Sequence, residues 1–164
     1  MSTNQTYKDL FDKALSNDEI NALAALQVGE ISAVQAYDQA LDRVKNMELV
    51  PTLEECRESH AQRAAMLRVR LRELGANPLK DGGLLGGLAS IVESAACTLG
   101  DQRGIEVLAK GESIGTEKYE SYMGALDAES WHLVKEELWP LQKRTEQMMS
   151  LLCNVHEGDI KKSA

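Results

Sequence analysis

Apolar residues recur every three or four positions along most of this chain, which is the spacing of one face of an α-helix. The pattern falls into four long segments that turn residues separate, and we expect helices over about 17–46, 51–75, 101–126 and 128–154. The chain has only three prolines and no alternating β-branched stretches, so we predict an all-α domain. Pro140 predicts a kink in the last helix.

Short connections join the first helix to the second and the third to the fourth, so each pair is expected to form an antiparallel hairpin. Between the hairpins, residues 77–100 contain two Gly-Gly pairs and an apolar stretch from Leu84 to Leu99, which we interpret as a shorter helix. A helix of about 15 residues spans roughly 22 Å, most of the length of a bundle. We therefore predict one domain over residues 1–164, with its core at 17–155 and a long crossover between the hairpins.

Two glutamates lie on the apolar faces of the first and third helices. Glu30 and Glu112 each follow a glycine, and each precedes a tyrosine by seven residues, Tyr37 and Tyr119. Desolvating a carboxylate in a core costs several kcal/mol unless it has a partner. The partner of each could be a metal, an arginine, a histidine or a shared proton.

Composition and charge narrow the classes of function. The chain has 164 residues, 43% of them hydrophobic, and a formal net charge of −8, which argues against a nucleic-acid partner and against an anionic membrane surface. Cys56, Cys97 and Cys153 are widely spaced and odd in number, which indicates reduced thiols. With no apolar run of signal-peptide or membrane-spanning length, we expect a cytoplasmic protein.

Several short motifs occur in a characteristic order between about residues 23 and 126. They are Gly29-Glu30, His60-Ala61-Gln62-Arg63, Leu74-Gly75-Ala76-Asn77-Pro78, a glycine-rich stretch and Gly111-Glu112. Together with the two hairpins and the crossover, they resemble a ferritin-like four-helix bundle. More narrowly, the chain is similar to a family of uncharacterised bacterial ferritin-like domains. This resemblance implies a fold and no established activity.

A di-iron centre of the ferritin-like type also needs a Glu-x-x-His pair on the second helix of each hairpin. Neither helix has such a pair at the level of the glutamates. Arg57 precedes His60 at that spacing, and His132 is preceded by Glu129 but lies almost at the start of its helix. Counting residues back from the first turn places residue 67 at the level of Glu30. The same count places His60 roughly 10 Å along the axis from Glu30.

Two interpretations of the glutamates stay open. In the first they are buried carboxylates, and their partners are Arg63 or Arg70, Gln27, Gln142 and a shared proton. In the second Glu30 and Glu112 bind Fe, Mn or Zn, with His60 or Glu146 completing the ligand set. The count from the second turn places Glu112 level with residue 142, where the candidate neighbours are Gln142, Thr145 and Glu146.

For the other reactive side chains we expect a structural role in the core. We expect His60 to be a core histidine bonded to Tyr37, and Cys56 on the same stripe to be buried and inert. No nucleophile elbow, phosphate-binding loop or metalloprotease motif is present, so no catalytic residue is assigned.

The leading hypothesis is therefore a non-catalytic ferritin-like bundle with a degenerate carboxylate centre and no cofactor. We expect it to form a homo-oligomer, or to bind a protein partner through the charged face of its second helix. The alternative is a metal-binding carboxylate bundle with oxidase, peroxide-handling or metal-storage chemistry.

Overall fold

The computed structural model describes the backbone of residues 3–78 and 100–162, with side chains described within 17–78 and 100–154. In these ranges the regular elements are all helices, which confirms the all-α prediction. The four long helices are α1 (Thr3–Leu41), α2 (Val50–Glu73), α4 (Gly100–Tyr122) and α6 (Trp139–Lys162). Three short elements lie between α4 and α6: η1 (Met123–Ala125), α5 (Ala128–His132) and the π-helical η2 (Leu133–Leu138).

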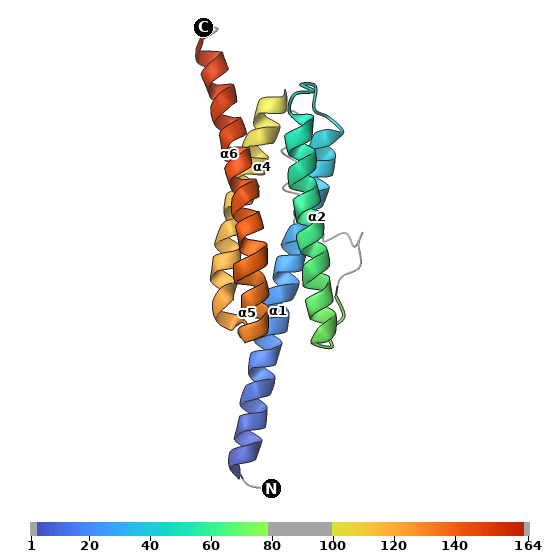
Figure 1. The fold of residues 1–164 in the computed structure, drawn as a ribbon, viewed down its shortest axis with the longest axis vertical. Coiled ribbons are helices and arrows are strands. Elements are labelled where there is room, and N and C mark those ends of the chain that lie inside the picture. The colour runs from blue at the N-terminus through green and yellow to red at the C-terminus, as the bar shows by residue number, and fades with distance from the viewer. Residues whose placement is uncertain (1–2, 79–99, 163–164) are drawn as a thin grey trace.

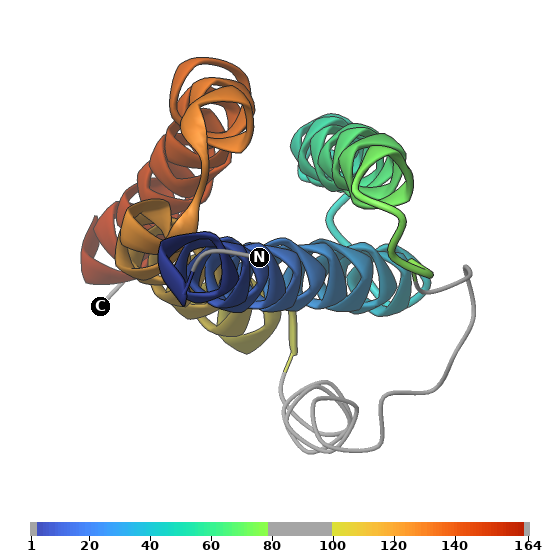
Figure 2. The same cartoon turned by 90° about the horizontal axis from the view of Figure 1, so that it is seen from below.

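The long helices run side by side along one axis (Figure 1). Helix α1 packs mainly on α2, and α4 packs mainly on α6, as the predicted hairpins require. Seen from below, α2 and α6 both lie on one side of the pair that α1 and α4 form (Figure 2). The first part of α1 extends past the other helices at one end, and the last part of α6 extends at the opposite end (Figure 1).

The first helix starts earlier and ends sooner than its apolar pattern predicts. It begins at Thr3, and it ends at Leu41 although the prediction extended it to about residue 46. The early end has a partner in α4, because the carboxylate of Asp101 accepts hydrogen bonds from the backbone N–H groups of Lys45 and Asn46 at 3.1 and 2.8 Å. The turn that follows α1 is therefore held by a side chain at the start of α4.

The sequence predicts a kink at Pro140, and the structure has a helical irregularity in the turns just before this residue. Residues Leu133–Leu138 form a π-helix, and the backbone N–H of Trp139 bonds the carbonyl of Val134, five residues back. A proline ring clashes with the carbonyl one turn earlier in an α-helix. The wider π turn makes room for the ring, so the helix passes through this point without ending.

The buried apolar side chains form two clusters. The first contains Leu23, Leu26, Leu67, Leu71, Tyr119, Val134 and Leu138. The second contains Tyr37, Leu49, Leu53, Cys56, Ile105, Leu108 and Met149. On α1, α2 and α4 the two clusters take residues from opposite ends. The middle of the bundle is left to polar side chains, including Glu30 and Glu112.

The predicted shorter helix from Leu84 to Leu99 lies outside the described residues. Among the helices that the structure describes, none is long and apolar enough to cross a lipid bilayer.

Candidate functional site

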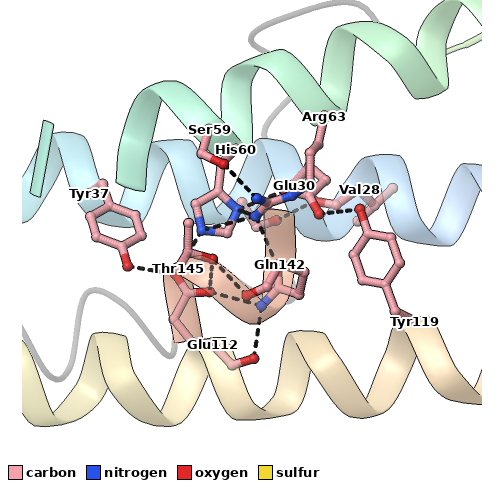
Figure 3. Close-up of polar contacts among 11 residues, drawn as sticks. Val28, Glu30, Tyr37, Ser59, His60, Arg63, Glu112, Tyr119, Gln142 and Thr145 are labelled. Carbon is pink, nitrogen blue, oxygen red and sulfur yellow. Dashed lines mark hydrogen bonds and ion pairs between the residues drawn. The ribbon is translucent and has the colours of Figure 1, made fainter. Parts of the chain in front are cut away.

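The two glutamates predicted from the sequence face each other across the middle of the bundle (Figure 3). The hydroxyl of Tyr37 on α1 donates to Oε1 of Glu112 on α4 at 2.5 Å. The hydroxyl of Tyr119 on α4 donates to Oε1 of Glu30 on α1 at 2.6 Å. Seven residues are about two helical turns, so in antiparallel helices each tyrosine lies level with the opposite glutamate. The repeated Glu and Tyr spacing thus produces a reciprocal pair of hydrogen bonds.

His60 on α2 bridges the two carboxylates. Its Nδ1 lies 2.7 Å from Oε2 of Glu30, and its Nε2 lies 2.8 Å from Oε1 of Glu112. An imidazole that donates from both nitrogens is protonated and positively charged. Burial lowers the pKa of His60, but the hydrogen bonds with Glu112 and Glu30 outweigh burial, so its pKa is raised. The two flanking carboxylates and the raised pKa both favour the imidazolium form of the ring.

The prediction that His60 lies roughly 10 Å along the helix axis from Glu30 is wrong, because the two side chains are in contact. Glu30 lies about three turns before the end of α1 at Leu41, and His60 lies about three turns after the start of α2 at Val50. The two are level because α1 ends early and a longer connection follows it. The predicted bond from His60 to Tyr37 is also wrong: the Tyr37 hydroxyl goes to Glu112, and the two rings only pack, with centroids 5.3 Å apart.

Arg63 lies one turn after His60 and is completely buried. Its Nε lies 3.0 Å from Oε2 of Glu30. Its Nη1 donates to Oγ of Ser59 at 2.8 Å, and its Nη2 donates to Oε1 of Gln142 at 2.9 Å. Nη2 also lies 2.7 Å from Nδ1 of His60. With Nδ1 protonated this last contact joins two donors, so the Nδ1 proton goes to Glu30 and the guanidinium is held by its other partners.

Helix α6 provides the remaining contacts to Glu112. The side-chain amide of Gln142 donates to Oε2 of Glu112 at 2.8 Å and to its backbone carbonyl at 2.9 Å. Oγ1 of Thr145 donates to the same Oε2 at 2.7 Å. The predicted level of Glu112 near residue 142 is therefore confirmed. Gly115 permits this approach, because a Cβ at position 115 would lie 2.9 Å from Nε2 of Gln142.

These contacts occupy all four carboxylate oxygens with donors from the chain itself. We call the group the central network; it consists of Glu30, Tyr37, His60, Arg63, Glu112, Tyr119, Gln142 and Thr145. Burial raises the pKa of both glutamates, but the hydrogen bonds from His60 and the nearby positive charge outweigh burial, so both pKa values are lowered. Two carboxylates, one imidazolium and one guanidinium leave the network with no net charge.

The remaining sequence candidates lie elsewhere. Oε2 of Glu146 accepts hydrogen bonds from Thr116 at 3.1 Å and from Lys143 at 2.7 Å, at a partly exposed edge outside the central network. Arg70 lies near the start of α5, where its Nε donates to Oγ of Ser130 at 2.7 Å and its Nη2 pairs with Asp127. Of the two arginines proposed as partners of Glu30, Arg63 is the one that contacts it.

Among the described side chains, no group of three or more His, Cys, Asp or Glu residues is arranged to hold a metal ion. Glu30, His60 and Glu112 do meet, but the imidazole ring stands between the carboxylates and each nitrogen faces a different one. Ligands of a single ion must instead direct their lone pairs at one common point.

Sequence reasoning missed the part that Tyr37 and Tyr119 play as donors to the opposite glutamates, since it expected Tyr37 to bond His60 and assigned no partner to Tyr119. The signal was present in the identical seven-residue spacing of Glu and Tyr in the two helices. Recognising it required knowing that the two helices run antiparallel with each glutamate level with the opposite tyrosine.

Comparison with known proteins assigns the chain to a family. One family model, that of a domain of unknown function (DUF2383), matches residues 18–125. The matched part contains Glu30, His60, Arg63 and Glu112, whereas α6 with Gln142 lies beyond it. Neither the curated proteins nor the solved structures gave a match. Because the family model covers more than half of the chain, this protein belongs to the DUF2383 family.

Proposed function

We propose that this protein is a non-catalytic ferritin-like helical bundle whose carboxylate centre is neutralised by its own cations in place of a metal. The observation that carries the proposal is the position of His60 and Arg63. Both side chains are buried against Glu30, at 2.7 and 3.0 Å, in the middle of the bundle. The centre then serves to hold four helices together, and the function resides on the helix surfaces.

The residues level with the glutamates support this proposal. The second helix of each hairpin contributes a pair at i, i+3 spacing: His60 with Arg63 on α2, and Gln142 with Thr145 on α6. A ferritin-like di-iron centre takes Glu-x-x-His from these two helices. This chain keeps the two first-helix carboxylates and has no Glu-x-x-His pair level with them, because its one such sequence, Glu129 to His132, lies in α5.

The charge of Arg63 is a second support. A guanidinium does not lose its proton in proteins, so a cation bound beside Glu30 would meet a fixed positive charge. At a separation of about 4 Å, the repulsion is about 4 kcal/mol for each unit of charge with an effective dielectric constant near 20. The donor set therefore does not fit a dinuclear metal centre with Arg63 in place.

The metal-binding alternative has one observation in its favour, which is that Glu30, His60 and Glu112 meet at all. Metal content per chain separates the two proposals. We would measure it by inductively coupled plasma mass spectrometry on untagged protein, purified without chelator from iron- and manganese-supplemented cells. The matched variants are Glu30→Gln/Glu112→Gln and the exposed pair Glu54→Gln/Glu58→Gln on α2.

If the proposal is correct, we expect a metal content far below one ion per chain in the wild type and in both double variants. About one or two ions per chain, lost in Glu30→Gln/Glu112→Gln and retained in Glu54→Gln/Glu58→Gln, would overturn it. That result would redirect attention to redox chemistry at the carboxylates.

We further propose that the helix surfaces act through self-association. Trp131 and Val69 support this, because 41% and 54% of these large apolar side chains are exposed in the single chain. Sedimentation velocity over a wide concentration range tests it. A species of higher mass is expected, whereas a monomer at every concentration would count against self-association.

A further inference from the structure

A long apolar groove follows α1 and α4. Its volume is about 1030 Å³, and its lining extends from Ala25 on α1 to Lys45 in the turn after it, and from Gly100 to Tyr119 on α4. Pockets that hold small molecules have volumes of about 300–1,000 Å³. A Cβ atom added at Gly29 or Gly111, which both line the groove, would meet nothing within 4 Å. Among the described residues, the groove therefore has room for a long and narrow ligand.

Four cationic side chains line this groove: Arg43, Lys45, Lys110 and Lys118. All four are exposed, and none of them forms an ion pair within the described part of the chain. Exposed arginines elsewhere do find partners, since Arg144 pairs with Glu55. The chain as a whole has a formal net charge of −8. Four unpaired cations along one groove of an acidic protein indicate an anionic ligand.

The acidic side chains of the lining do not cancel this charge. Glu30 and Glu112 belong to the central network, in which His60 and Arg63 neutralise them. Asp101 is the third acidic residue of the lining, and its carboxylate is held by backbone N–H groups of the turn after α1. The groove therefore keeps an excess of positive charge.

Three of the four cations lie in one half of the groove. The reciprocal bonds between the tyrosines and the glutamates fix the levels of α1 and α4 relative to each other, and they place Lys110 level with Gln39. Arg43 and Lys45 follow Gln39 within about two turns. Lys118 lies about two turns from Lys110 in the other direction.

This half has the groups that would hold a carboxylate. A guanidinium and two ammonium groups donate charge-assisted hydrogen bonds, and their long stems let the charged ends reach a ligand from the rim. The side chain of Gln39 lines the same half, and its buried Oε1 has no hydrogen-bond partner among the described residues. Rotation of this amide would turn its N–H groups toward a bound anion.

The other half suits a hydrocarbon chain. Between Ala25 and Ala36 the α1 wall consists mostly of small or apolar residues, over roughly 16 Å. On α4 the facing wall includes Gly111 and Ile114, and the Ile114 side chain is 45% exposed. Apolar surface of this extent next to a charged rim marks a binding site in a soluble protein.

We propose that the groove along α1 and α4 binds a long-chain carboxylate. Its head lies at Arg43, Lys45 and Lys110, and its hydrocarbon chain lies against the small residues between Ala25 and Ala36. This is a binding activity of the helix surface, and it does not depend on whether the central network holds a metal.

Titration calorimetry with dodecanoate below its micellar concentration tests the proposal, after any copurified lipid has been removed on a hydrophobic resin. We expect saturation at about one dodecanoate per chain. Each buried CH₂ group favours binding about fourfold, so dodecanoate should bind at least about tenfold more tightly than octanoate. Dodecyltrimethylammonium, which has the same chain and the opposite charge, should bind at least about tenfold more weakly than dodecanoate. Equal binding of the two dodecyl compounds would overturn the proposal, and so would no binding of dodecanoate.

A pair of charge variants tests the position of the head. Arg43→Gln/Lys110→Gln should weaken dodecanoate binding about fivefold, the effect of losing two exposed ion pairs. Arg72→Gln/Arg103→Gln removes the same charge at exposed positions outside the groove, and it should leave the affinity unchanged. Equal losses in the two variants would show that only the net charge of the protein matters, which contradicts a head bound at these residues.

A bulky substitution tests the position of the hydrocarbon chain. Gly111→Trp fills the groove, and Ser113→Trp places the same ring at an exposed position outside it on the same helix. Gly111→Trp should weaken dodecanoate binding at least about tenfold, while Ser113→Trp keeps the wild-type affinity. Circular dichroism checks that both variants are folded. Wild-type affinity in folded Gly111→Trp would overturn the proposal. A protein that binds no dodecanoate and forms a dimer that Gly111→Trp dissociates would identify a second copy as the occupant, and would also overturn it.

Discussion

Nε2 of His60 lies 2.8 Å from Oε1 of Glu112, and this contact ties α2 to α4 across the bundle. The same ring reaches Glu30 on α1 through its other nitrogen. One side chain therefore links three helices, because it contacts a carboxylate on each of the other two. The stability of the bundle should depend on this ring more than its size suggests.

Replacing His60 by alanine should destabilise the protein by about 3–5 kcal/mol, the range for removing one member of a buried charged group. The reason is that two buried carboxylates would then share a single cation, Arg63. Urea unfolding followed by circular dichroism measures the change in the free energy of unfolding. His132→Ala is the matched control, since His132 is exposed on α5, and it should change stability by less than about 0.5 kcal/mol. Equal effects of the two substitutions would show that the bridge adds no stability.

The stability should also depend on pH with a definite sign. The pKa of His60 in the folded protein is raised above its ordinary value of 6.5. Its stabilising effect is therefore complete below that value and is lost as the pH rises through the folded pKa. The pKa values of Glu30 and Glu112 are lowered from 4.5, so their effect is present above 4.5 and is lost as the pH falls through their folded values.

Stability should thus be highest between about pH 4.5 and 6.5 and fall on both sides. Urea midpoints measured from pH 3 to 9 test this. The groups that face His60 are Glu30, Glu112, Arg63 and the Tyr37 ring. The alkaline fall should disappear in His60→Ala and persist in His132→Ala. An alkaline fall that survives in His60→Ala would assign it to another group.

Arg63 and Glu30 should behave as a coupled pair. Arg63→Met leaves the network with two carboxylates and one imidazolium, and should cost about 3–5 kcal/mol. Adding Glu30→Gln restores neutrality, so the double variant should be more stable than Arg63→Met alone. A double-mutant cycle in urea measures the coupling energy, and additive effects would contradict the assigned ion pair.

Arg57→Met is the control for that cycle. Arg57 lies on the same helix and pairs with Asp38, but its side chain is 36% exposed. Solvent screens such a pair, so its loss should cost no more than about 1 kcal/mol.

The sequence predicted the helices and their pairing well because helical periodicity is a local property. The apolar stripes located all four long helices, and the short connections paired them correctly. The end of α1 was the main error, because Asp101, more than fifty residues away, provides the cap for the turn after it. A contact between distant segments leaves no trace in the local pattern.

The end of α1 at Leu41 determined how much of the central network could be predicted. Glu30 and Glu112 were identified because a carboxylate on an apolar stripe is conspicuous. Residue 142 was placed correctly because the turn of the second hairpin lies where it was predicted. Element η1 ends at Ala125 and α5 begins at Ala128. His60 was misplaced because the early end of α1 shifted the level of α2, which put the wrong residues beside Glu30.

The two tyrosines should contribute equally to stability. Tyr37→Phe and Tyr119→Phe each remove one hydroxyl that donates to a buried carboxylate. Each should cost about 1.5–3 kcal/mol, the usual range for hydrogen bonds to charged groups. Tyr122→Phe is the control, since its ring packs beside the first apolar cluster. A cost for Tyr122→Phe as large as the other two would argue against the reciprocal bonds.

Cys56 should be unreactive in the folded protein. Its side chain is completely buried in the second apolar cluster, and burial, followed by the charge of Glu112, raises the pKa of its thiol to about 12. At pH 8 only about one thiol in ten thousand would then be ionised, and the thiolate is the form that reacts. Iodoacetamide labelling followed by peptide mass spectrometry should leave Cys56 unmodified in native buffer and modify it fully in guanidinium chloride. Cys153, which is only partly buried, should react faster in native buffer. Equal native rates would mean that the interior around Glu112 opens readily, which a neutral and fully bonded central network should prevent.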